Sequence, residues 1–267
     1  MSTATSATLA STGYGDAGPR VVFLHGLFGQ GRNFTGVAKA LADAARVLLV
    51  DLPDHGRSPW STDFSYPAMA DQVADLLRAQ APGEGWTVVG HSMGGKVAML
   101  IALRHPDLVE RLCVVDVAPA TTAALSGFGT YVTALRGVDL DSLPDRATAD
   151  STVSRLVPDP AVRGFLLQNL RREGSGAGAS WRWQMNLDLL GDRLTEIAGW
   201  PETPGRYDGP VLWLAGESSD YVRPGLVPAM RALFPRVRLI RVKNAGHWVH
   251  ADQPAVFVAT VRAFLHL

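Results

Sequence analysis

The sequence predicts an α/β fold: a doubly wound, mostly parallel sheet with a helical cap inserted into it. Short apolar segments alternate along the chain with amphipathic segments of helical length. Most of the short segments are apolar on both faces, which is typical of strands that are covered on both sides in a parallel sheet. This alternation stops between about residues 120 and 207, where short helical patterns take its place.

Six apolar segments are the expected strands, and the amphipathic segments between them are the expected helices. The strands are expected at residues 20–24, 46–50, 86–89, 112–115, 211–214 and 237–240. Helices are expected at 34–45, 66–77 and 96–103, with a terminal helix from about residue 253. Regular alternation of this kind favours a doubly wound sheet with helices on both faces.

The segment between residues 120 and 207 is expected to be an all-helical insertion in a single α/β domain. It contains no convincing buried strand, and residues 159–171 place their apolar side chains on one helical face. Residues 173–180 are rich in Gly, Ser and Ala and indicate a flexible connector. We therefore expect a core formed by residues 1–119 and 208–267, with 120–207 as a cap.

The composition excludes several classes of protein. The chain has 267 residues, of which 47% are hydrophobic and 19% charged, so it can bury a full core and is not a disordered chain. Lys+Arg and Asp+Glu number 25 each, so the net charge is zero and we expect neither nucleic acid nor membrane as a partner. Cys113 is the only cysteine, which excludes an internal disulfide and a zinc cluster of cysteines.

The chain also lacks the patterns of an exported or membrane-spanning protein. Its first residues are rich in Ser, Thr and Ala, with no Lys or Arg before Arg20 and no apolar stretch, unlike a secretory signal. The longest apolar run in an expected helix, residues 97–103, is far shorter than the roughly 18 residues that span a membrane. We expect a soluble, cytoplasmic protein.

The segment Gly90-His91-Ser92-Met93-Gly94 lies between an expected strand and an expected helix. A serine in the pattern G-x-S-x-G at such a junction is typical of a nucleophile elbow, because the tight turn needs small neighbours and the helix N-terminus favours negative charge. The simpler interpretation is an ordinary glycine-rich turn between strand and helix. The position of the motif favours Ser92 as a nucleophile.

The loop His25-Gly26-Leu27-Phe28-Gly29 directly follows the first strong strand. In this kind of fold that loop supplies one backbone amide of an oxyanion hole, and the residue after the nucleophile supplies the other. We therefore expect the amides of Leu27 and Met93 to hold an oxyanion. His25 and His55 are expected to line the site without transferring protons.

His247 lies in the loop Asn244-Ala245-Gly246-His247-Trp248 after the last strand. Because the carboxyl ends of parallel strands share one edge of the sheet, this histidine is expected near Ser92, where it is the candidate general base. Most histidines are structural or exposed, and we assign His91, His105 and His266 to that class. His250 is expected to pack at the start of the terminal helix.

With these motifs the chain resembles α/β-hydrolase-fold serine esterases over essentially its whole length. More narrowly, it resembles a branch of small acyl-ester and acyl-CoA thioester hydrolases of bacteria and mitochondria. The segments that carry the resemblance are residues 25–29, 51–58, 90–96, 115–119 and 246–248 in the core, and 181–183 and 197–200 in the insertion.

The resemblance implies a Ser-His-Asp triad that forms an acyl-enzyme without a metal or organic cofactor. The commonest family pattern has Gly-x-x-Asp after the strand at 211–214, but here that position is Ser219. Asp116, in a context that the narrower branch shares, is therefore the expected acid that orients His247. Asp220, one residue late, is the alternative, and Ser219 is in a position to add a hydrogen bond.

The resemblance also implies that the insertion forms a lid over an acyl pocket, with a small-molecule acyl ester or thioester as substrate. The side chains expected to contact substrate are His25, Phe28, Trp181, Trp183, Ser219 and Trp248. The sequence defines neither the acyl group nor the oligomeric state.

Four other activities on related folds, and one inert relative, are considered. Haloalkane dehalogenases and epoxide hydrolases are set aside because they carry an aspartate where this chain has Ser92. A carbon–carbon bond hydrolase or a cofactor-free haloperoxidase would keep the same triad and stays open. A catalytically inert binding relative would normally have lost Ser92 or His247, and both are present.

Overall fold

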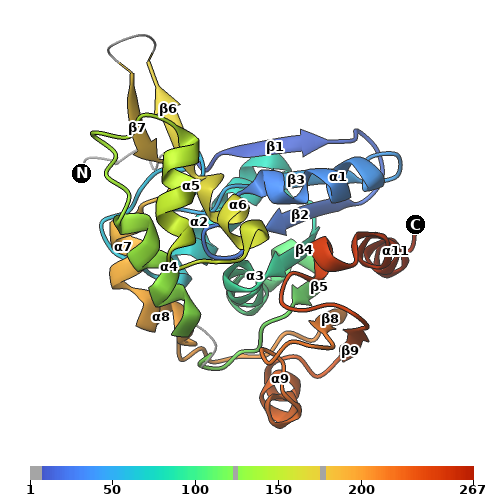
Figure 1. The fold of residues 1–267 in the computed structure, drawn as a ribbon. Coiled ribbons are helices and arrows are strands. Elements are labelled where there is room, and N and C mark those ends of the chain that lie inside the picture. Colours follow the sequence, from blue (N-terminus) through green and yellow to red (C-terminus); the bar gives the residue numbers. More distant parts are fainter. Residues whose placement is uncertain (1–7, 123–125, 175–178) are drawn as a thin grey trace, which may run out of the picture.

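The computed structural model describes residues 8–122, 126–174 and 179–267, and its centre is a seven-stranded sheet (Figure 1). The strand order is β1-β3-β2-β4-β5-β8-β9, and all neighbours are parallel except β1 and β3. The strands are β1 (Ser11–Tyr14), β2 (Arg20–Leu24), β3 (Arg46–Val50), β4 (Trp86–His91), β5 (Val109–Val115), β8 (Val211–Gly216) and β9 (Val237–Val242). The predicted doubly wound, mostly parallel sheet is confirmed.

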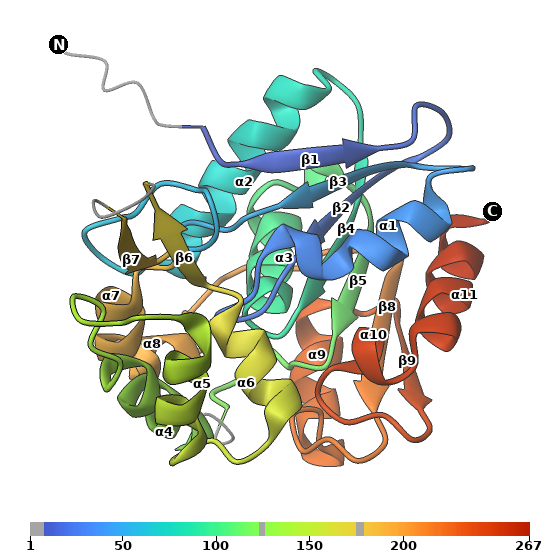
Figure 2. The ribbon, with the colours of Figure 1, turned by 45° about the horizontal axis from the view of Figure 1, so that its top comes forward.

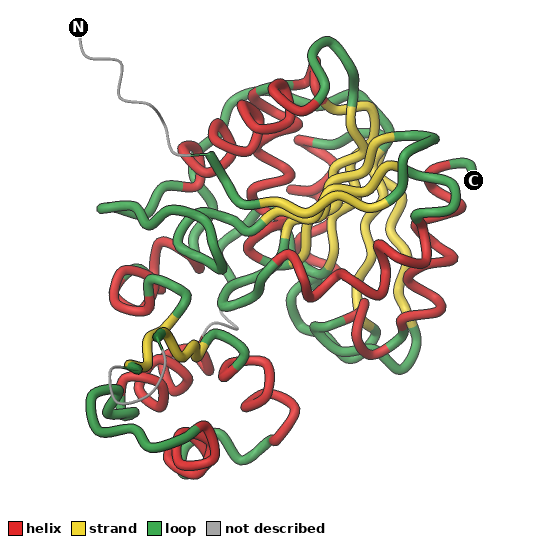
Figure 3. Tube along the Cα trace, turned by 90° about the horizontal axis from the view of Figure 1, so that it is seen from above, coloured by secondary structure: helices red, strands yellow, loops and turns green. Residues whose placement is uncertain are grey.

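Helices cover both faces of the sheet (Figure 3). Alternate residues of β2 point to opposite faces: Val21 and Phe23 pack with the helices at residues 35–41 and 254–265, whereas Val22 and Leu24 pack with the helices at 66–80 and 93–104. These core helices are α1 (Thr35–Leu41), α2 (Tyr66–Gln80), α3 (Met93–Arg104), α9 (Val227–Leu233), α10 (Val249–Asp252) and α11 (Pro254–Leu265). Because both faces are covered, the central strands are buried along nearly their whole length.

The two edge strands differ from the sequence-based expectation. Strand β1 is polar and has no apolar run that would predict it, and it joins the edge of the sheet by antiparallel pairing with β3. Strand β9 includes the segment expected at residues 237–240, but Leu239 and Ile240 are 36% and 42% exposed, unlike the covered strands expected for most of these segments. An apolar run in an edge strand is indistinguishable in sequence from one at the centre of a sheet, because only the strand order decides how it is covered.

The insertion forms a cap beside the sheet (Figure 2). It contains α4 (Ser126–Arg136), α5 (Arg146–Ser154), α6 (Pro160–Leu167), β6 (Leu170–Glu173), β7 (Ser180–Trp183), α7 (Leu187–Asp192) and α8 (Leu194–Ala198). The prediction of an all-helical insertion is wrong, because β6 and β7 form an antiparallel hairpin. The expected helix at 159–171 ends early, at Leu167. The predicted connector includes the last residue of β6 and the first of β7, and its residues 175–178 lie outside the described part of the chain.

Hydrogen bonds attach the cap to loops of the core. Asn169, between α6 and β6, donates to the carbonyl of Phe28 at 2.8 Å and accepts from the Gln30 amide at 2.6 Å. Asn186, before α7, donates to the backbone carbonyl and the carboxylate of Asp54 at 2.8 and 2.9 Å. These loops follow β2 and β3, so the cap is anchored at the carboxyl ends of the central strands.

Candidate active site

Ser92 occupies a sharp turn between β4 and α3, and its backbone is strained. Its φ of 52° and ψ of −119° are unusual for a residue with a side chain. A Cβ on Gly90 would collide with the carbonyl oxygen of Gly94, and a Cβ on Gly94 would collide with that of Leu24. The two glycines of the motif therefore have a steric reason: the turn is too tight for any larger residue at either position.

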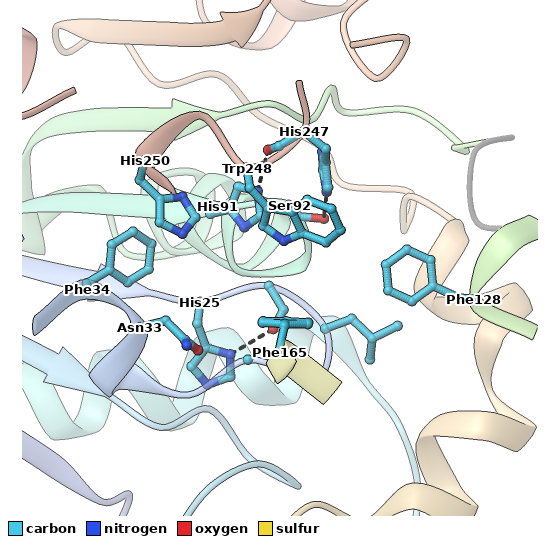
Figure 4. A pocket seen from close by; sticks show the side chains of 13 residues that line it. His25, Asn33, Phe34, His91, Ser92, Phe128, Phe165, His247, Trp248 and His250 are labelled. Atoms are coloured by element: carbon cyan, nitrogen blue, oxygen red, sulfur yellow. Dashed lines mark hydrogen bonds between the residues drawn. The ribbon is translucent and has the colours of Figure 1, made fainter. Parts of the chain in front are cut away.

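The structure brings Ser92, His247 and Asp116 together in one hydrogen-bonded line. Nε2 of His247 lies 3.0 Å from Oγ of Ser92, and Nδ1 of His247 lies 2.8 Å from Oδ2 of Asp116. Figure 4 shows the imidazole of His247 pointing toward Ser92. Since an ionised carboxylate only accepts, Nδ1 donates to Asp116 and the neutral ring offers Nε2 as an acceptor to the serine hydroxyl. This is the tautomer that a general base needs.

Asp116 follows β5, is fully buried and accepts three hydrogen bonds. Besides His247, the backbone amide of Gly216 donates to Oδ1 at 3.0 Å, and the hydroxyl of Ser219 donates to Oδ2. Asp220 instead is exposed, and its nearest cation is Arg223 at 3.9 Å. The structure therefore places Asp116, and not Asp220, against the candidate base.

Two side chains that the sequence analysis did not assign to the site hold His247 in place. The ring of Tyr221 is stacked on the imidazole, with 3.8 Å between ring centroids and an angle of 17° between planes. His91 Nε2 donates to the backbone carbonyl of His247 at 2.8 Å, and burial lowers the pKa of His91 well below its usual range, so the ring is neutral. Because His91 directly precedes Ser92 in the elbow motif, its place in the sequence could have indicated that it lies next to the site.

His25 lines the site, but both of its ring nitrogens are already occupied. Nδ1 donates to the carbonyl of Gly26 at 2.8 Å, and Nε2 accepts from the amide of Leu52 at 3.0 Å. Burial lowers the pKa of His25 to about 3, which keeps the ring neutral. His55 is occupied in the same way and accepts from the amide of Phe28 at 3.1 Å. Both histidines thus shape the loops and have no free nitrogen for a substrate.

Leu27 and Met93, whose backbone amides are the candidates for an oxyanion hole, both line the cavity wall at Ser92. Met93 is the first residue of α3, where an amide has no partner within the helix. Leu27 lies in the loop after β2, and Gly26 approaches so closely that a Cβ there would lie 3.2 Å from Cβ of Ser92. Negative charge that develops beside Ser92 would lie at the positive end of α3.

Ser92 lies between two small cavities, which share only Leu27 and Ser92 itself. The first, here the aromatic cavity, is walled by Phe34, Phe128, Phe165 and Trp248 together with His25, His91, His247 and His250 (Figure 4). The second, here the lysine cavity, is lined by Tyr66, Met93, Lys96, Val117, Thr122, Ile197 and Tyr221. Ser92 is thus accessible from both cavities.

The expected substrate contacts are only partly brought to these cavities. Trp248 lines the aromatic cavity, and Ser219 instead contacts the carboxylate of Asp116. Phe28 is fully buried behind Phe128, with 5.9 Å between their rings, and it lines neither cavity. Trp181 and Trp183 belong to the hairpin of the cap and also line neither, since the hairpin lies at the outer side of the cap.

Comparison with known proteins agrees with this geometry. A family model described as alpha/beta hydrolase fold matches residues 19–254. The chain belongs to this family. The sn-1-specific diacylglycerol lipase ABHD11 of Mus musculus is 43% identical over 253 residues, which cover 92% of this chain and 81% of the lipase. Esterase YbfF of Escherichia coli is 30% identical over 246 residues, which cover 92% of each chain.

Solved structures give the same result. The structure of a marine microorganism esterase has a TM-score of 0.92 and 33% identity, covering 97% of this chain and all of that one. The predicted resemblance to esterases of this fold is thereby confirmed, and so is the prediction of a carboxylic ester hydrolase. In the part of the chain that the structure describes, none of the helices has the length and apolar character needed to cross a membrane.

If Asp116 orients His247, neutralising it should nearly abolish turnover. We expect Asp116→Asn to lower kcat by about 10⁴-fold, because the amide favours the wrong imidazole tautomer. Asp220→Asn, at an exposed position 104 places along the chain from Asp116, is the matched control and should change kcat by less than about tenfold. Steady-state kinetics on one p-nitrophenyl ester, with circular dichroism to check folding, measures both. The reverse ranking would contradict the assignment of Asp116.

The neutral histidines around the site should make the protein sensitive to acid. His25 and His91 stay neutral in the folded protein, whereas in the unfolded chain they bind protons below about pH 6.5. Their folded pKa values are lowered, so stability is lost as pH falls below 6.5, by up to about 1.4 kcal/mol per pH unit for each histidine. Urea unfolding between pH 7 and pH 4.5 measures this loss.

A single substitution separates this effect from general acid denaturation. His250 has its pKa lowered to about 4 by burial and packs against Phe34 and Phe257. We expect His250→Phe to make the loss of stability with falling pH shallower. The exposed His266→Asn is the control and should leave the slope unchanged. Equal slopes in all three proteins would show that the histidines do not govern acid stability.

Proposed function

We propose that this enzyme hydrolyses carboxylic esters through a covalent acyl-enzyme on Ser92, with His247 as general base and Asp116 as the acid that orients it. The observation that carries the proposal is the line of two hydrogen bonds, 3.0 and 2.8 Å long, that joins the three side chains on separate loops of the sheet edge. A simple turn between β4 and α3 would not need a strained backbone at Ser92 or a histidine and an aspartate hydrogen-bonded in series to its side chain. The arrangement is the one that activates a serine nucleophile.

The reaction proceeds in two halves. Ser92 Oγ attacks the ester carbonyl as His247 Nε2 takes its proton, and the amides of Leu27 and Met93 stabilise the oxyanion. Collapse of the tetrahedral intermediate breaks the bond to the alcohol, which leaves with the proton from His247. Water then attacks the acyl-enzyme with the same base, releasing the carboxylic acid and Ser92. Buried Asp116 stabilises the imidazolium that forms in both halves.

The expected substrate is a neutral ester with an apolar acyl chain. The aromatic cavity offers the faces of Phe128, Phe165 and Trp248, and the chain as a whole has no net charge that would attract an anionic substrate. The relatives include lipases named for diacylglycerol, so acylglycerols are the first natural class to test. Acyl-CoA thioesters share the same carbonyl chemistry and serve as the competing class.

Loss of the nucleophile should abolish acyl-enzyme formation and most of the activity. We expect Ser92→Ala to lower kcat by at least about 10³-fold while leaving the fold intact, since the oxyanion hole and substrate binding alone retain a small catalytic effect. A fluorophosphonate probe should label the wild-type protein and not this variant, as read by intact-protein mass spectrometry.

Ser61→Ala is a control for this experiment, because Ser61 hydrogen-bonds to Asp54 away from the triad. It should be labelled like the wild type. Near-full turnover by Ser92→Ala, or labelling at another serine, would refute the proposed nucleophile.

The aromatic cavity should decide which acyl chains are accepted. We expect Phe165→Ala to shift the preference toward longer chains, because Phe165 packs against Trp248 with 5.8 Å between rings and its removal enlarges the cavity. The shift in kcat/KM between neighbouring chain lengths should be about tenfold, the scale of one or two methylene contacts. The control is Trp60→Ala, which removes a 53%-exposed ring outside both cavities. An unchanged profile for Phe165→Ala would mean that the cap is only structural here.

A further inference from the structure

Lys96 is a buried cation one helical turn beyond Ser92 on α3. Its side chain is only 2% exposed, and its Nζ lies 3.1, 2.7 and 2.6 Å from the carbonyl oxygens of Ile197, Ala198 and Gly199. An ammonium group has three protons to donate, so these three carbonyls satisfy it completely. Among the described residues it forms no salt bridge with a carboxylate.

Burying a charge without a counter-charge is costly, so this arrangement needs a reason. The three carbonyls are at the end of α8, which belongs to the cap, whereas Lys96 belongs to the core helix that carries the nucleophile. The hydroxyl of Tyr66, from α2, donates to the same Ile197 carbonyl at 2.7 Å, and the Tyr66 ring lies 5.6 Å from the ammonium. Two core side chains thus hold one turn of the cap.

The turn that they hold is a wall of the active site. Lys96, Tyr66 and Ile197 line the lysine cavity together with Ser92. If α8 moved outward, this cavity would widen on the side of the reacting carbonyl. The hydrogen bonds of the Lys96 ammonium therefore join the nucleophile helix to this part of the cap.

We propose that Lys96 is a positioning residue for the hydrolytic reaction: its ammonium fixes the end of α8 and so sets the shape of the lysine cavity beside Ser92. The inference rests on the proposed function, because it takes Ser92 as the nucleophile. If so, substrate binding in the lysine cavity depends on the charge of Lys96, although Lys96 does not contact the triad.

The charge of Lys96 should change within an accessible pH range. Burial lowers the pKa of Lys96 to about 7, and the three carbonyl oxygens oppose this by favouring the charged form. The titratable groups on the elements packed around it are Tyr66 from α2, Tyr221, the pair Asp116 and His247, and Glu196 of α8, which lies 3.5 Å from Arg193. Burial raises the pKa of both tyrosines, so they stay neutral as Lys96 loses its proton.

The first test compares three variants on p-nitrophenyl esters of graded chain length. We expect Lys96→Met, which keeps the apolar stem, to raise KM for a short ester by about tenfold with kcat changed less than threefold, because binding and not chemistry is affected. Lys96→Arg should keep KM near the wild-type value, since it retains the charge and the donors. The exposed Lys39→Met is the control and should match the wild type.

The pH profile distinguishes positioning from mere packing. In the wild type, kcat/KM should fall on the alkaline side as Lys96 is deprotonated, and Lys96→Arg should lack this fall because arginine stays charged. If Lys96→Met instead keeps the wild-type KM and pH profile and melts at a higher temperature, Lys96 is only a buried charge and the inference is overturned.

A second measurement needs no variant that could fail to fold. The chain has three lysines, Lys39, Lys96 and Lys243, so protein labelled with ¹³C at lysine Cε gives three resonances to follow by pH titration. We expect one resonance to titrate with a lowered pKa, at the midpoint of the alkaline fall in activity. If no resonance does so, the inference is wrong. Fluorophosphonate labelling separates the two proposals: an unlabelled wild type refutes the nucleophile, whereas normal labelling with these negative results refutes Lys96 alone.

Discussion

The buried carboxylate of Asp116 is the interaction on which the arrangement of the site depends. It lies at the end of β5 and accepts from the amide of Gly216 at the end of β8, from Ser219 in the following loop, and from His247 in the loop after β9. One side chain therefore links the carboxyl ends of three neighbouring strands. A buried charge is tolerated only when such donors satisfy it, so the loops must adopt this geometry for the core to close.

The same carboxylate explains why the acid can follow β5 in this chain. Asp116 has a φ of +50°, a conformation that turns the chain sharply and directs the side chain toward the neighbouring loops. Ser219 occupies the place where the commonest family pattern has an acid, and here its hydroxyl donates to the Asp116 carboxylate. An acid at both places would set two carboxylates side by side and raise the pKa of one of them. A hydroxyl at 219 avoids that repulsion and adds a hydrogen bond.

The sequence allowed the sheet and the centre of the site to be predicted because both depend on local patterns. Strands covered on both faces appear as apolar runs, and the elbow appears as glycines around Ser92, since no larger residue fits there. Features that depend on contacts between distant segments were missed. The ring of Tyr221 reaches His247 only through the pairing of β8 and β9, and nothing in its local sequence indicates this.

The cap was less predictable than the core for the same reason. Its hairpin has four residues on each strand, and only β7 alternates aromatic with polar side chains, which is too short a pattern to stand out beside helices. Trp181 and Trp183, which resemble the family's cap, belong to this hairpin, whereas the cavity is walled by Phe128 and Phe165 of α4 and α6. A resemblance identifies the segment, but packing decides which of its aromatic side chains faces the nucleophile.

Different parts of the cap are attached to the core by different kinds of hydrogen bond. Asn169 is held by neutral hydrogen bonds to the loop after β2, and Asn186 is held by the backbone carbonyl and the carboxylate of Asp54 after β3. The end of α8 is instead held by a charged donor on the helix that begins at Ser92. Hydrogen bonds to a charged donor are stronger than neutral ones, and a low dielectric strengthens them further. The cavity wall nearest the nucleophile is therefore the part of the cap whose attachment responds to the charge of the core, while the asparagine contacts keep the rest of the cap in place whatever the charge of Lys96.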